Sequence, residues 1–497
     1  MIGMEKKNNL YLNSRREFLK VLLSLPLSLA HSSSYAVTHV SRDIRLKTLG
    51  KKVVVVGAGL AGLTAAYELT DAGFDVFVLE AQKRVGGRVF TMRDQFADGL
   101  YAEAGASRIP NNHHRTIEYL KKFNLPLEPF RSTELPDIYY LHGKRVVAKR
   151  DELAQLPLDL TADERNLGLA GLRKKYIDSV LEEIGDPGSE GWSPASFRKY
   201  DQMTFVEFLK RQGASPDAIL LLTIGHNAGR VAQVSALDQL RSLALGKKRK
   251  QFYKIRGGND LLPQSFAERL GNKIMFDATV VKIKHTQTNV RAVYRSYGED
   301  QSVDADYLVS AIPFSVLRRI ELSPKLSEGK QKAIEELSYV SCTRIYLQTK
   351  NKFWRSEESS DHGLTDLPIA ETWDISSGQK SSRGILVAYF TGTSARDFQT
   401  LSEPEQIDQT LKQAENLYPG LRDSFEKGVS KCWDDDEWAR GAWAQFLPGE
   451  MSALSPYVAP PEGRIHFAGE HTSAWTGWME GAIESGQRVA REIIQKQ

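Results

Sequence analysis

The first strongly apolar stretch of the chain predicts a strand, a glycine turn, a helix and a second strand. Residues 53–56 are four consecutive valines, a run of β-branched residues typical of a strand buried in a parallel sheet. A helix-like stretch follows the glycine turn and ends at Gly73. Residues 74–79 are again mostly apolar and predict the second strand. The order indicates the start of an α/β domain with a parallel sheet.

The remainder of the chain predicts further domains. Residues 148–249 are polar and periodic, which predicts a helical segment interrupted by a loop near residues 185–188. Residues 344–349 and 384–390 predict strands, and a last helix is expected to run to about Gln495. Because 497 residues are too many for one compact core, we expect two or three domains.

Composition and charge narrow the class of protein. With 41% hydrophobic and 26% charged residues, the chain has the composition of an ordinary globular protein. Of the formal net charge of +4, the first 36 residues carry +3, from five basic and two acidic residues. The nearly neutral remainder gives no reason to expect a nucleic-acid partner. Residues 247–250, Lys-Lys-Arg-Lys, form a dense basic run, which we interpret as a solvated loop.

The two cysteines, Cys342 and Cys432, are ninety positions apart. No Cys/His spacing indicates zinc or an iron–sulfur cluster, so we expect no metal. Outside the cytoplasm a disulfide between the two thiols is chemically allowed, but we expect them to stay unpaired.

The N-terminus has the layout of an export signal. Arg15 and Arg16 lie in a charged segment, a short apolar stretch runs from Val21 to Ala30, and small residues precede Ala36. This layout is typical of a twin-arginine signal peptide, which we assign to residues 1–36. We therefore expect a periplasmic or secreted protein and contact with the twin-arginine translocase. The alternative is an amphipathic N-terminal helix.

The glycine turn has the spacing of a dinucleotide site. Gly57, Gly59 and Gly62 allow a tight turn and a close approach of the backbone to a pyrophosphate at a helix N-terminus. Glu80 follows Gly62 by eighteen residues and is placed to accept hydrogen bonds from a ribose diol. A glycine motif alone is weak, but strand, glycines, helix, strand and acid in this order are specific.

The next segment resembles a known family. Glu80 is followed by Gly86, Gly87 and Arg88, and this acid–Gly-Gly-Arg spacing resembles the signature of the FAD-containing amine oxidase superfamily, which includes monoamine, polyamine and L-amino acid oxidases. Arg88 is expected to meet the diphosphate charge. Near the C-terminus, Gly469-Glu470 and residues 475–482 resemble the family's flavin-contacting segments. Residues 257–263 and Val280 match it as well, so the resemblance spans about residues 50–495.

The resemblance implies noncovalent FAD as the cofactor and a discontinuous fold. The expected cofactor contacts are Gly57, Gly59, Leu60, Ala61, Gly62, Glu80, Ala81, Gly86, Gly87, Arg88, Gly105, Ala106, Ser107, Arg108, Val280, Trp433, Glu470, Gly477, Trp478, Met479 and Ala482. The fold class is α/β (α+β overall), with a Rossmann-like FAD-binding domain of the glutathione-reductase and amine-oxidase type. We assign that domain to residues 45–90, 250–335 and 434–497, a mixed-sheet substrate domain to 91–147 and 336–433, and a helical insertion to 148–249.

Residues 105–110 indicate the branch of the superfamily. This segment resembles the stretch of L-amino acid oxidases in which an arginine, here Arg108, holds the substrate carboxylate. A planar guanidinium donates two parallel hydrogen bonds to a carboxylate and keeps its positive charge. The alternative is a surface arginine on a loop. Trp443 and Trp478 match positions where amine oxidases set aromatic residues beside the flavin. Trp373 lies near a position where the family uses tyrosine as a second carboxylate partner, and its indole has only an N–H to donate.

Two positions depart from the family pattern. Ala442 stands where monoamine oxidases carry the cysteine linked to their flavin, which is why we expect noncovalent FAD. Arg344, which we take as the catalytic residue, stands where the family usually has a lysine that holds a water near flavin N5. Arginine keeps the positive charge but differs from lysine in length and geometry. Rapid reoxidation of the reduced flavin by oxygen is therefore a less firm prediction than hydride removal.

The resemblance therefore implies an L-amino acid oxidase. A hydride would leave Cα for flavin N5, oxygen would be reduced to hydrogen peroxide, and the imino acid would hydrolyse to a 2-oxo acid and ammonia. Two tryptophans and no clear pocket carboxylate favour large apolar or aromatic substrates. Family members are often dimers. The alternatives are an amine or polyamine oxidase and a non-catalytic exported FAD protein. His226 and His466 are candidate bases, and His471 is interpreted as a structural neighbour of Glu470.

Overall fold

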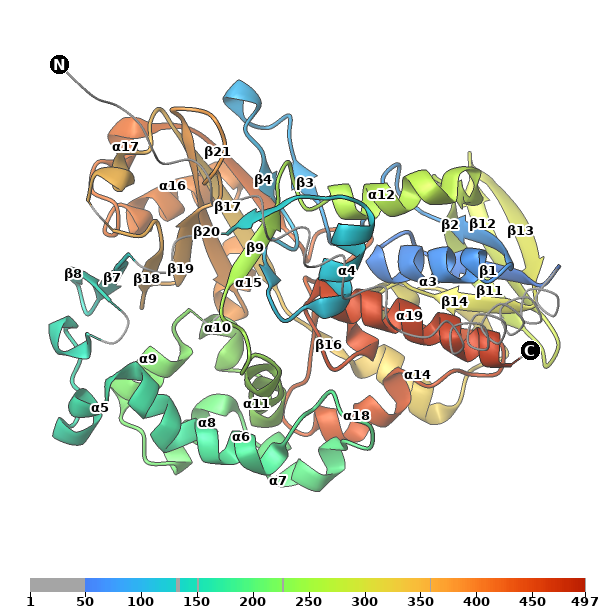
Figure 1. Ribbon diagram of the computed structural model, residues 1–497, viewed down its shortest axis with the longest axis horizontal. Helices are drawn as coiled ribbons and strands as arrows, with labels where there is room; N and C mark the ends of the chain where they lie inside the picture. Colours follow the sequence, from blue (N-terminus) through green and yellow to red (C-terminus); the bar gives the residue numbers. More distant parts are fainter. Residues whose placement is uncertain (1–49, 131–134, 150–151, 226–227, 358, 497) are drawn as a thin grey trace, which may run out of the picture.

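The computed structural model describes residues 50–130, 135–149, 152–225, 228–357 and 359–496. The predicted signal peptide, residues 1–36, and His226 lie outside these ranges. Figure 1 shows three lobes around a common centre: a sheet with helices at the right, a second sheet at the upper left, and a group of helices at the lower left.

The dinucleotide lobe, at the right of Figure 1, is built on a five-stranded parallel sheet. Its central strand is the valine run, and its neighbours come from distant parts of the chain. In spatial order the strands are β10 (Ile274–Met275), β2 (Asp75–Leu79), β1 (Lys52–Val56), β14 (Tyr307–Ser310) and β23 (Ile465–Phe467). The valines of β1 are buried from both sides, which explains their uninterrupted apolar run.

The two faces of β1 pack into different cores. Val53 and Val55 join the core formed with α3 (Leu60–Asp71), α12 (Leu261–Leu270) and α19 (Met479–Gln495). Val54 and Val56 join a core that includes the four-stranded sheet of β13 (Glu299–Ala305), β12 (Val290–Ser296), β11 (Thr279–His285) and β15 (Glu321–Ser323). The first and last helices touch: a Cβ on Gly486 of α19 would lie 2.5 Å from the carbonyl oxygen of Ala61. The C-terminus is thereby brought back to the glycine turn.

The sheet lobe, at the upper left of Figure 1, is a seven-stranded mixed sheet. Neighbouring strands are antiparallel except for the parallel pair of β18 and β7. In spatial order the strands are β21 (Phe425–Cys432), β17 (Cys342–Thr349), β20 (Gly384–Thr391), β19 (Glu371–Asp374), β18 (Gly363–Thr365), β7 (Asp137–Leu141) and β8 (Lys144–Ala148). All residues of β17 and β20 are buried, and α15 (Thr393–Gln399) and α16 (Glu403–Ala414) pack against this part of the sheet.

The helical lobe lies within the predicted insertion and is drawn in green in Figure 1. Several of its helices begin at a side-chain cap, as at Thr161, Thr204 and Ser215. The helices are α5 (Ala162–Arg173), α6 (Ser179–Ile184), α7 (Arg198–Asp201), α8 (Phe205–Arg211), α9 (Pro216–Thr223), α10 (Ala228–Val231) and α11 (Ala236–Leu245). The predicted loop begins at Gly185, whose φ is +68°, directly after α6.

A small three-stranded sheet joins the lobes. It pairs β9 (Phe252–Ile255) with β5 (Ile109–Pro110) and β6 (Leu127–Pro129), and α4 (His114–Lys122) lies between the last two in sequence. Because β5 starts directly after Arg108, this pairing fixes the backbone around that residue.

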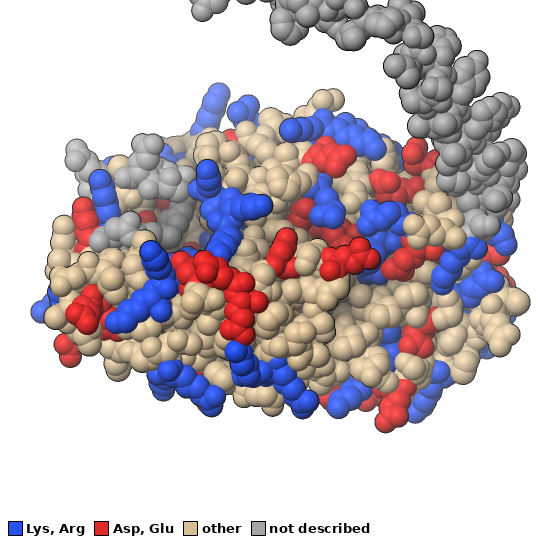
Figure 2. Space-filling model, turned by 60° about the horizontal axis from the view of Figure 1, so that its bottom comes forward, with Lys and Arg blue, Asp and Glu red and all other residues tan. Residues whose placement is uncertain are grey.

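The cysteines and the surface complete the description. Cys342 and Cys432 lie on neighbouring strands, and both are free thiols. On the face shown in Figure 2, basic and acidic side chains are interspersed, in keeping with the small net charge. Within the part of the chain that the structure describes, no helix has both the length and the apolarity needed to cross a membrane.

Candidate functional site

A large central cavity opens where the three lobes meet. Its empty volume is about 1840 Å³, which includes the solvent at its open mouth. The following predicted site residues line it: Gly57, Gly59, Leu60, Ala61, Glu80, Ala81, Gly86, Gly87, Arg88, Gly105, Ala106, Ser107, Arg108, Val280, Arg344, Trp433, Trp443, Glu470, Gly477, Trp478, Met479 and Ala482. Gly62 and Trp373 are not among the lining residues.

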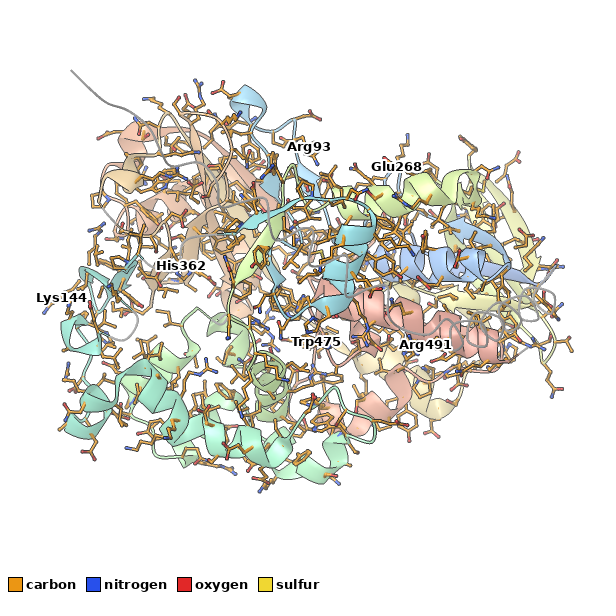
Figure 3. The ribbon with its side chains drawn as sticks, in the orientation of Figure 1. Arg93, Lys144, Glu268, His362, Trp475 and Arg491 are labelled. Carbon is orange, nitrogen blue, oxygen red and sulfur yellow. The ribbon has the colours of Figure 1, made fainter. Side chains whose placement is uncertain are left out.

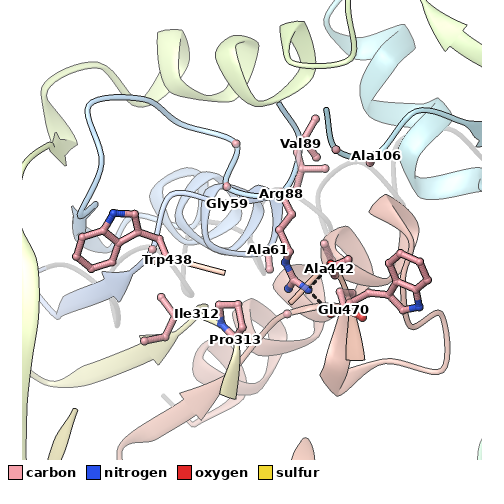
Figure 4. A pocket seen from close by; sticks show the side chains of 18 of the residues that line it. Gly59, Ala61, Arg88, Val89, Ala106, Ile312, Pro313, Trp438, Ala442 and Glu470 are labelled. Carbon is pink, nitrogen blue, oxygen red and sulfur yellow. Dashed lines mark hydrogen bonds and ion pairs between the residues drawn. The ribbon is translucent and has the colours of Figure 1, made fainter. Parts of the chain in front are cut away.

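The glycine turn forms one end of the cavity, as the close view in Figure 4 shows for Gly59 and Ala61. Gly57 has φ +100°, a conformation that side chains disfavour. Gly59 caps α3, and a Cβ added there meets no atom within 4 Å. The first amides of α3 have no partner inside the helix, and they lie beside this space. The turn therefore fits a phosphate group.

Gly62 supports the turn from behind. A Cβ on Gly62 would lie 2.0 Å from the carbonyl oxygen of Gly57, so no side chain fits between helix and turn. Gly62 therefore has a packing role, and its expected cofactor contact stays a prediction. Gly105 is similarly enclosed, since a Cβ there would lie 1.9 Å from the carbonyl oxygen of Arg88.

Glu80 directly follows β2, lines the same cavity and is buried. Its carboxylate accepts hydrogen bonds from the backbone N–H groups of Ala58, at 2.7 Å, and Gln82, at 2.9 Å. Burial raises the pKa of Glu80 above its ordinary value. Each carboxylate oxygen has a second lone pair, so Glu80 can still accept from the hydroxyls of a ribose. Val280, at the start of β11, lies at the same end.

Arg88 and Glu470 tie the front of the cavity together. Nη1 of Arg88 donates to Oε1 of Glu470 at 2.7 Å and to the carbonyl oxygen of Ala442 at 3.1 Å (Figure 4). Glu470 also accepts from the backbone N–H groups of Ala444 and Gly477. The sequence predicts that Arg88 binds the diphosphate. Nη1 of Arg88 is instead hydrogen-bonded to a carboxylate of the protein. The pair joins three segments that are remote in sequence.

Arg108 is enclosed by aromatic rings at another part of the cavity. Its guanidinium carbon lies 5.5 Å from the ring centre of Trp373, 5.6 Å from that of Phe252 and 5.9 Å from that of Phe130. Nη1 lies 3.6 Å from Oε1 of Glu371, which is buried behind it. The side chain of Arg108 is 23% exposed and lines the cavity. Arg108 is therefore a cavity residue and not a surface arginine.

Glu371 belongs to a buried chain of polar groups. Its Oε1 lies 2.9 Å from Nε2 of His362, and Nδ1 of His362 lies 3.4 Å from a carboxylate oxygen of Asp137. Figure 3 labels His362 close to the lower end of the seven-stranded sheet. This chain links β19 with β7 and fixes the carboxylate that faces Arg108. Sequence reasoning missed it, because its members come from strands far apart in the chain.

The tryptophans divide into two groups. Trp443 and Trp478 line the cavity, and Trp443 packs against Gly477, where a Cβ would lie 3.0 Å from its ring. Trp373 is 1% exposed and lies behind Arg108, so the expected contact of its indole with a substrate is wrong for this arrangement. On β19, Trp373 lies on the same face as Glu371, two residues earlier, and its ring packs against Phe130 and Tyr389.

Arg344 lines the cavity but is largely engaged by the backbone. Its Nη1 donates to the carbonyl oxygens of Glu103, at 3.0 Å, and Gly105, at 2.6 Å. Its guanidinium carbon also lies 4.8 Å from the ring centre of Tyr389, another cavity residue. Tyr389 was missed by sequence reasoning, although it lies in a strand that was predicted.

The helical lobe adds a buried group of charges. Arg230 lines the cavity and pairs with Asp238, which also pairs with Arg241 at 2.6 Å. Arg241 in turn donates to the hydroxyl of Thr476, beside the start of α19. Nothing in the local pattern of α10 or α11 distinguished these residues, because the pairing depends on the fold of the lobe.

Neither His466 nor His471 lines the cavity. His466 pairs with Glu492, and His471 packs against Phe314 with ring centres 4.5 Å apart. Burial lowers the pKa of both, that of His471 far below its ordinary value, so His471 is neutral in the folded protein. His226 is outside the described residues. Among the residues that are described, no cluster of three or more His, Cys, Asp and Glu side chains is arranged for a metal ion.

The residues present fit FAD. The glycine turn and the start of α3 suit a pyrophosphate, Glu80 suits a ribose, and the start of α19 brings a second helix N-terminus to the cavity. The enclosed glycines Gly86 and Gly105 let the backbone approach such a ligand closely, where a Cβ would meet backbone oxygen atoms.

Comparison with known proteins agrees with this geometry. The family model "Flavin containing amine oxidoreductase" matches residues 60–494. YobN of Bacillus subtilis (strain 168), named as a candidate L-amino-acid oxidase, is 35% identical over 457 residues, covering 89% of this chain and 94% of that protein. The L-amino-acid oxidase of the snake Pseudechis australis is 32% identical over 454 residues, covering 89% of this chain and 86% of that protein.

Solved structures share the fold. A triple mutant of putrescine oxidase superimposes with a TM-score of 0.80 at 24% identity, covering 90% of this chain and all of that one. Cyclohexylamine oxidase from Brevibacterium oxydans superimposes with a TM-score of 0.78 at 22% identity, covering 90% of this chain and 99% of that one. The predicted α/β fold of the FAD-binding amine oxidase type is thereby confirmed.

Proposed function

The chain belongs to the flavin-containing amine oxidoreductase family, is an FAD-dependent oxidoreductase acting on CH–NH2 groups, and we propose that within this family it oxidises L-amino acids. The observation that carries the proposal is the position of Arg108 at the cavity. Amines offer no carboxylate for such a residue, whereas every amino acid does. Relatives named L-amino-acid oxidases, similar over most of their length, support it.

Arg108 is suited to bind a carboxylate. Three aromatic rings fix the plane of its guanidinium, and Glu371 behind it orients the group without covering its cavity side. Its ion pair with Glu371 is long, at 3.6 Å, so further donors remain for a ligand. Because the planar guanidinium of Arg108 is already held in place, little side-chain entropy is lost when a carboxylate binds.

FAD supplies the redox chemistry, accepting a hydride from the substrate and passing the electrons to oxygen. The chain would hold it with the turn at Gly57 and Gly59, with Glu80, and with the start of α19. We propose that the attachment is noncovalent. Ala442 offers no nucleophile, and burial raises the pKa of the Cys342 thiol, which also lines the cavity, to about 12.

The charges around the cavity favour a neutral amine. The arginines and carboxylate residues that line it, within the described ranges, are four arginines and two glutamates, and both glutamates lie toward the cofactor end. Positive charge nearby lowers the pKa of a bound ammonium group. The substrate therefore loses its proton readily on binding, and the amine lone pair becomes available to assist departure of the hydride. No histidine base is needed for this step.

A polyamine oxidase is the second candidate, because putrescine oxidase shares the fold. A diamine would place its charged ends beside Arg108, Arg230 and Arg344. Like charges at short range are unfavourable in a partly desolvated cavity. The composition of the cavity thus favours the amino acid over the diamine.

A peroxide assay tests the proposal directly. The purified, FAD-loaded protein is given a panel of L-amino acids, the matching D-amino acids and the matching amines. We expect peroxide from L-amino acids and little from the other two sets. Turnover of amines alone would support the amine-oxidase candidate, and no turnover at all would support a non-catalytic FAD protein.

We further propose export through the twin-arginine translocase to the periplasm or the medium. The support is the sequence of residues 14–36, with its paired arginines, short apolar stretch and small residues before Ala36.

A further inference from the structure

Arg249 turns inward from a basic surface run. It follows α11 directly after two lysines, and Lys247, Lys248 and Lys250 are exposed, as expected for a solvated loop. Arg249 is only partly exposed: its guanidinium carbon lies 4.7 Å from a ring centre of Trp478 and 5.4 Å from that of Phe252. The sequence interpretation of this run as a solvated loop is therefore wrong for one of its four residues.

Among the residues that the structure describes, none supplies a counter-charge to Arg249. Burial and the charges of Arg108 and Arg173 lower the pKa of Arg249 to about 10, so the charges that act on it most strongly are cationic. Over the described ranges, no Asp or Glu forms an ion pair with it, and its buried Nε has no hydrogen-bond partner. An arginine stays charged even so, and a partly buried cation without an anion is unfavourable. The site is therefore prepared for an anion from outside the chain.

Arg249 borders the space next to the central cavity. It lines a small recess, whose empty volume of about 190 Å³ includes open solvent and which shares Ser242, Thr476 and Trp478 with that cavity. Arg108 and Arg249 both pack on the ring of Phe252. Figure 3 labels Trp475, which also lines the recess, near the middle of the molecule where the lobes meet. Two arginines are thus neighbours across one ring, and only Arg108 has a carboxylate of the protein beside it.

Resting on the proposed function, we propose that Arg249 binds a second carboxylate, in the side chain of the substrate, and that the enzyme prefers acidic L-amino acids. Arg108 binds the α-carboxylate, and Arg249 binds the other end of the same molecule. The exposed lysines beside Arg249 raise the local concentration of anionic substrates. This differs from the preference for large apolar or aromatic side chains expected from the sequence, where Arg249 was interpreted as part of a solvated loop.

The first test compares pairs of substrates that differ in charge and hardly in shape. The values of kcat/KM of the FAD-loaded enzyme are measured for L-glutamate against L-glutamine and for L-aspartate against L-asparagine. We expect the acid of at least one pair to be preferred about ten- to a hundredfold, the effect of one charge-assisted contact. Equal values, or preference for the amides, would overturn the inference. Turnover of neutral L-amino acids alone would leave the proposed function intact, whereas no L-amino acid turnover would remove both.

The second test uses Arg249→Gln with Lys250→Gln as its matched control. Both variants lose one positive charge from the same run, but only Arg249 faces the recess. We expect Arg249→Gln to lower the preference for acid over amide by about tenfold or more, Arg249→Lys to restore part of it, and Lys250→Gln to leave it unchanged. Equal losses on acid and amide would show that Arg249 only supports Trp478, and would overturn the inference. If Arg249→Gln does not fold, the comparison of each acid with its amide on the wild-type enzyme decides whether the inference holds.

Discussion

Nη1 of Arg344 donates a hydrogen bond of 2.6 Å to the carbonyl oxygen of Gly105, three residues before Arg108. The same nitrogen reaches the carbonyl oxygen of Glu103 at 3.0 Å, where the hydroxyl of Tyr346 also donates. Arg344 therefore holds the backbone that carries the proposed carboxylate-binding residue. This contact gives it a positioning role in addition to the oxygen chemistry expected from its place in the sequence.

We accordingly predict that Arg344→Met slows reduction by the substrate more than reoxidation by oxygen. The substitution removes the donor to the carbonyl of Gly105, whereas that of Glu103 keeps the hydroxyl of Tyr346. It thereby frees the backbone before Arg108, which we expect to cost about tenfold or more in the reductive step. Stopped-flow measurement of the two half-reactions separates the effects. A larger loss in the oxygen reaction would assign Arg344 to oxygen activation.

Glu103 provides a pH-dependent test of the fold. It is 3% exposed, and burial raises its pKa to about 7 from an ordinary value of 4.5. Between these values the folded protein keeps a proton that the unfolded chain has released. The contribution of Glu103 to the free energy of unfolding is therefore full below pH 4.5 and is lost as the pH rises through about 7.

We predict that Glu103→Gln, which stays neutral, is stabilised relative to the wild type as the pH rises. The relative gain from pH 4.5 to pH 8 should be about 1–3 kcal/mol, because one pKa unit corresponds to about 1.4 kcal/mol. Denaturant unfolding of both proteins at the two pH values measures it. A difference that does not change with pH would mean that Glu103 is already ionised in the folded state.

Noncovalent FAD leads to a simple prediction. Ala442 cannot form a bond to the flavin, and the protonated thiol of Cys342 is a poor nucleophile. Acid precipitation of the loaded protein should leave the yellow flavin in the supernatant. Flavin retained in a washed pellet would show a covalent attachment.

The dinucleotide end of the site could be predicted from the sequence because its geometry is local. The valine run, the glycines and Glu80 follow one another within thirty residues, and each has a steric or hydrogen-bonding reason for its place. Gly62 shows the limit of this reasoning. Its spacing predicts a cofactor contact, and the close packing on the backbone of Gly57 is visible only in the fold.

The substrate end could be predicted only in part. Arg108 was found through a resemblance, whereas Glu371 reaches it through strand pairing in the seven-stranded sheet. Trp373 was expected in the cavity, but it lies behind Arg108 and packs against Phe130 and Tyr389. The inward turn of Arg249 depends on the ring of Trp478, more than two hundred residues later in the chain. None of these relationships has a signature within one segment.

Export can be tested independently of catalysis. Replacing Arg15 and Arg16 with lysine keeps the charge but removes the guanidinium pair, and it should trap the full-length precursor in the cytoplasm of a bacterium with a twin-arginine system. Immunoblots of cell fractions measure this. Unchanged export of the double variant would mean that residues 1–36 are not that signal.

The central claim is that Arg108 binds the substrate carboxylate. Arg108→Ala should leave the carboxylate without its partner, and truncating one partner of a buried pair costs about 2–5 kcal/mol. The value of kcat/KM for an L-amino acid should then fall by about 30- to several-thousandfold. Arg108→Lys should recover only part of it, because an ammonium group cannot supply the planar fork.

The most direct measurement is the effect of Arg108→Ala on an L-amino acid and on the amine with the same side chain, such as L-phenylalanine and phenethylamine. Both substrates need the same fold and the same flavin, and they differ in the carboxylate alone. The account predicts a large loss of kcat/KM for the amino acid and little or no loss for the amine. Equal losses for both would contradict it, and would show that Arg108 supports the fold or the cofactor instead.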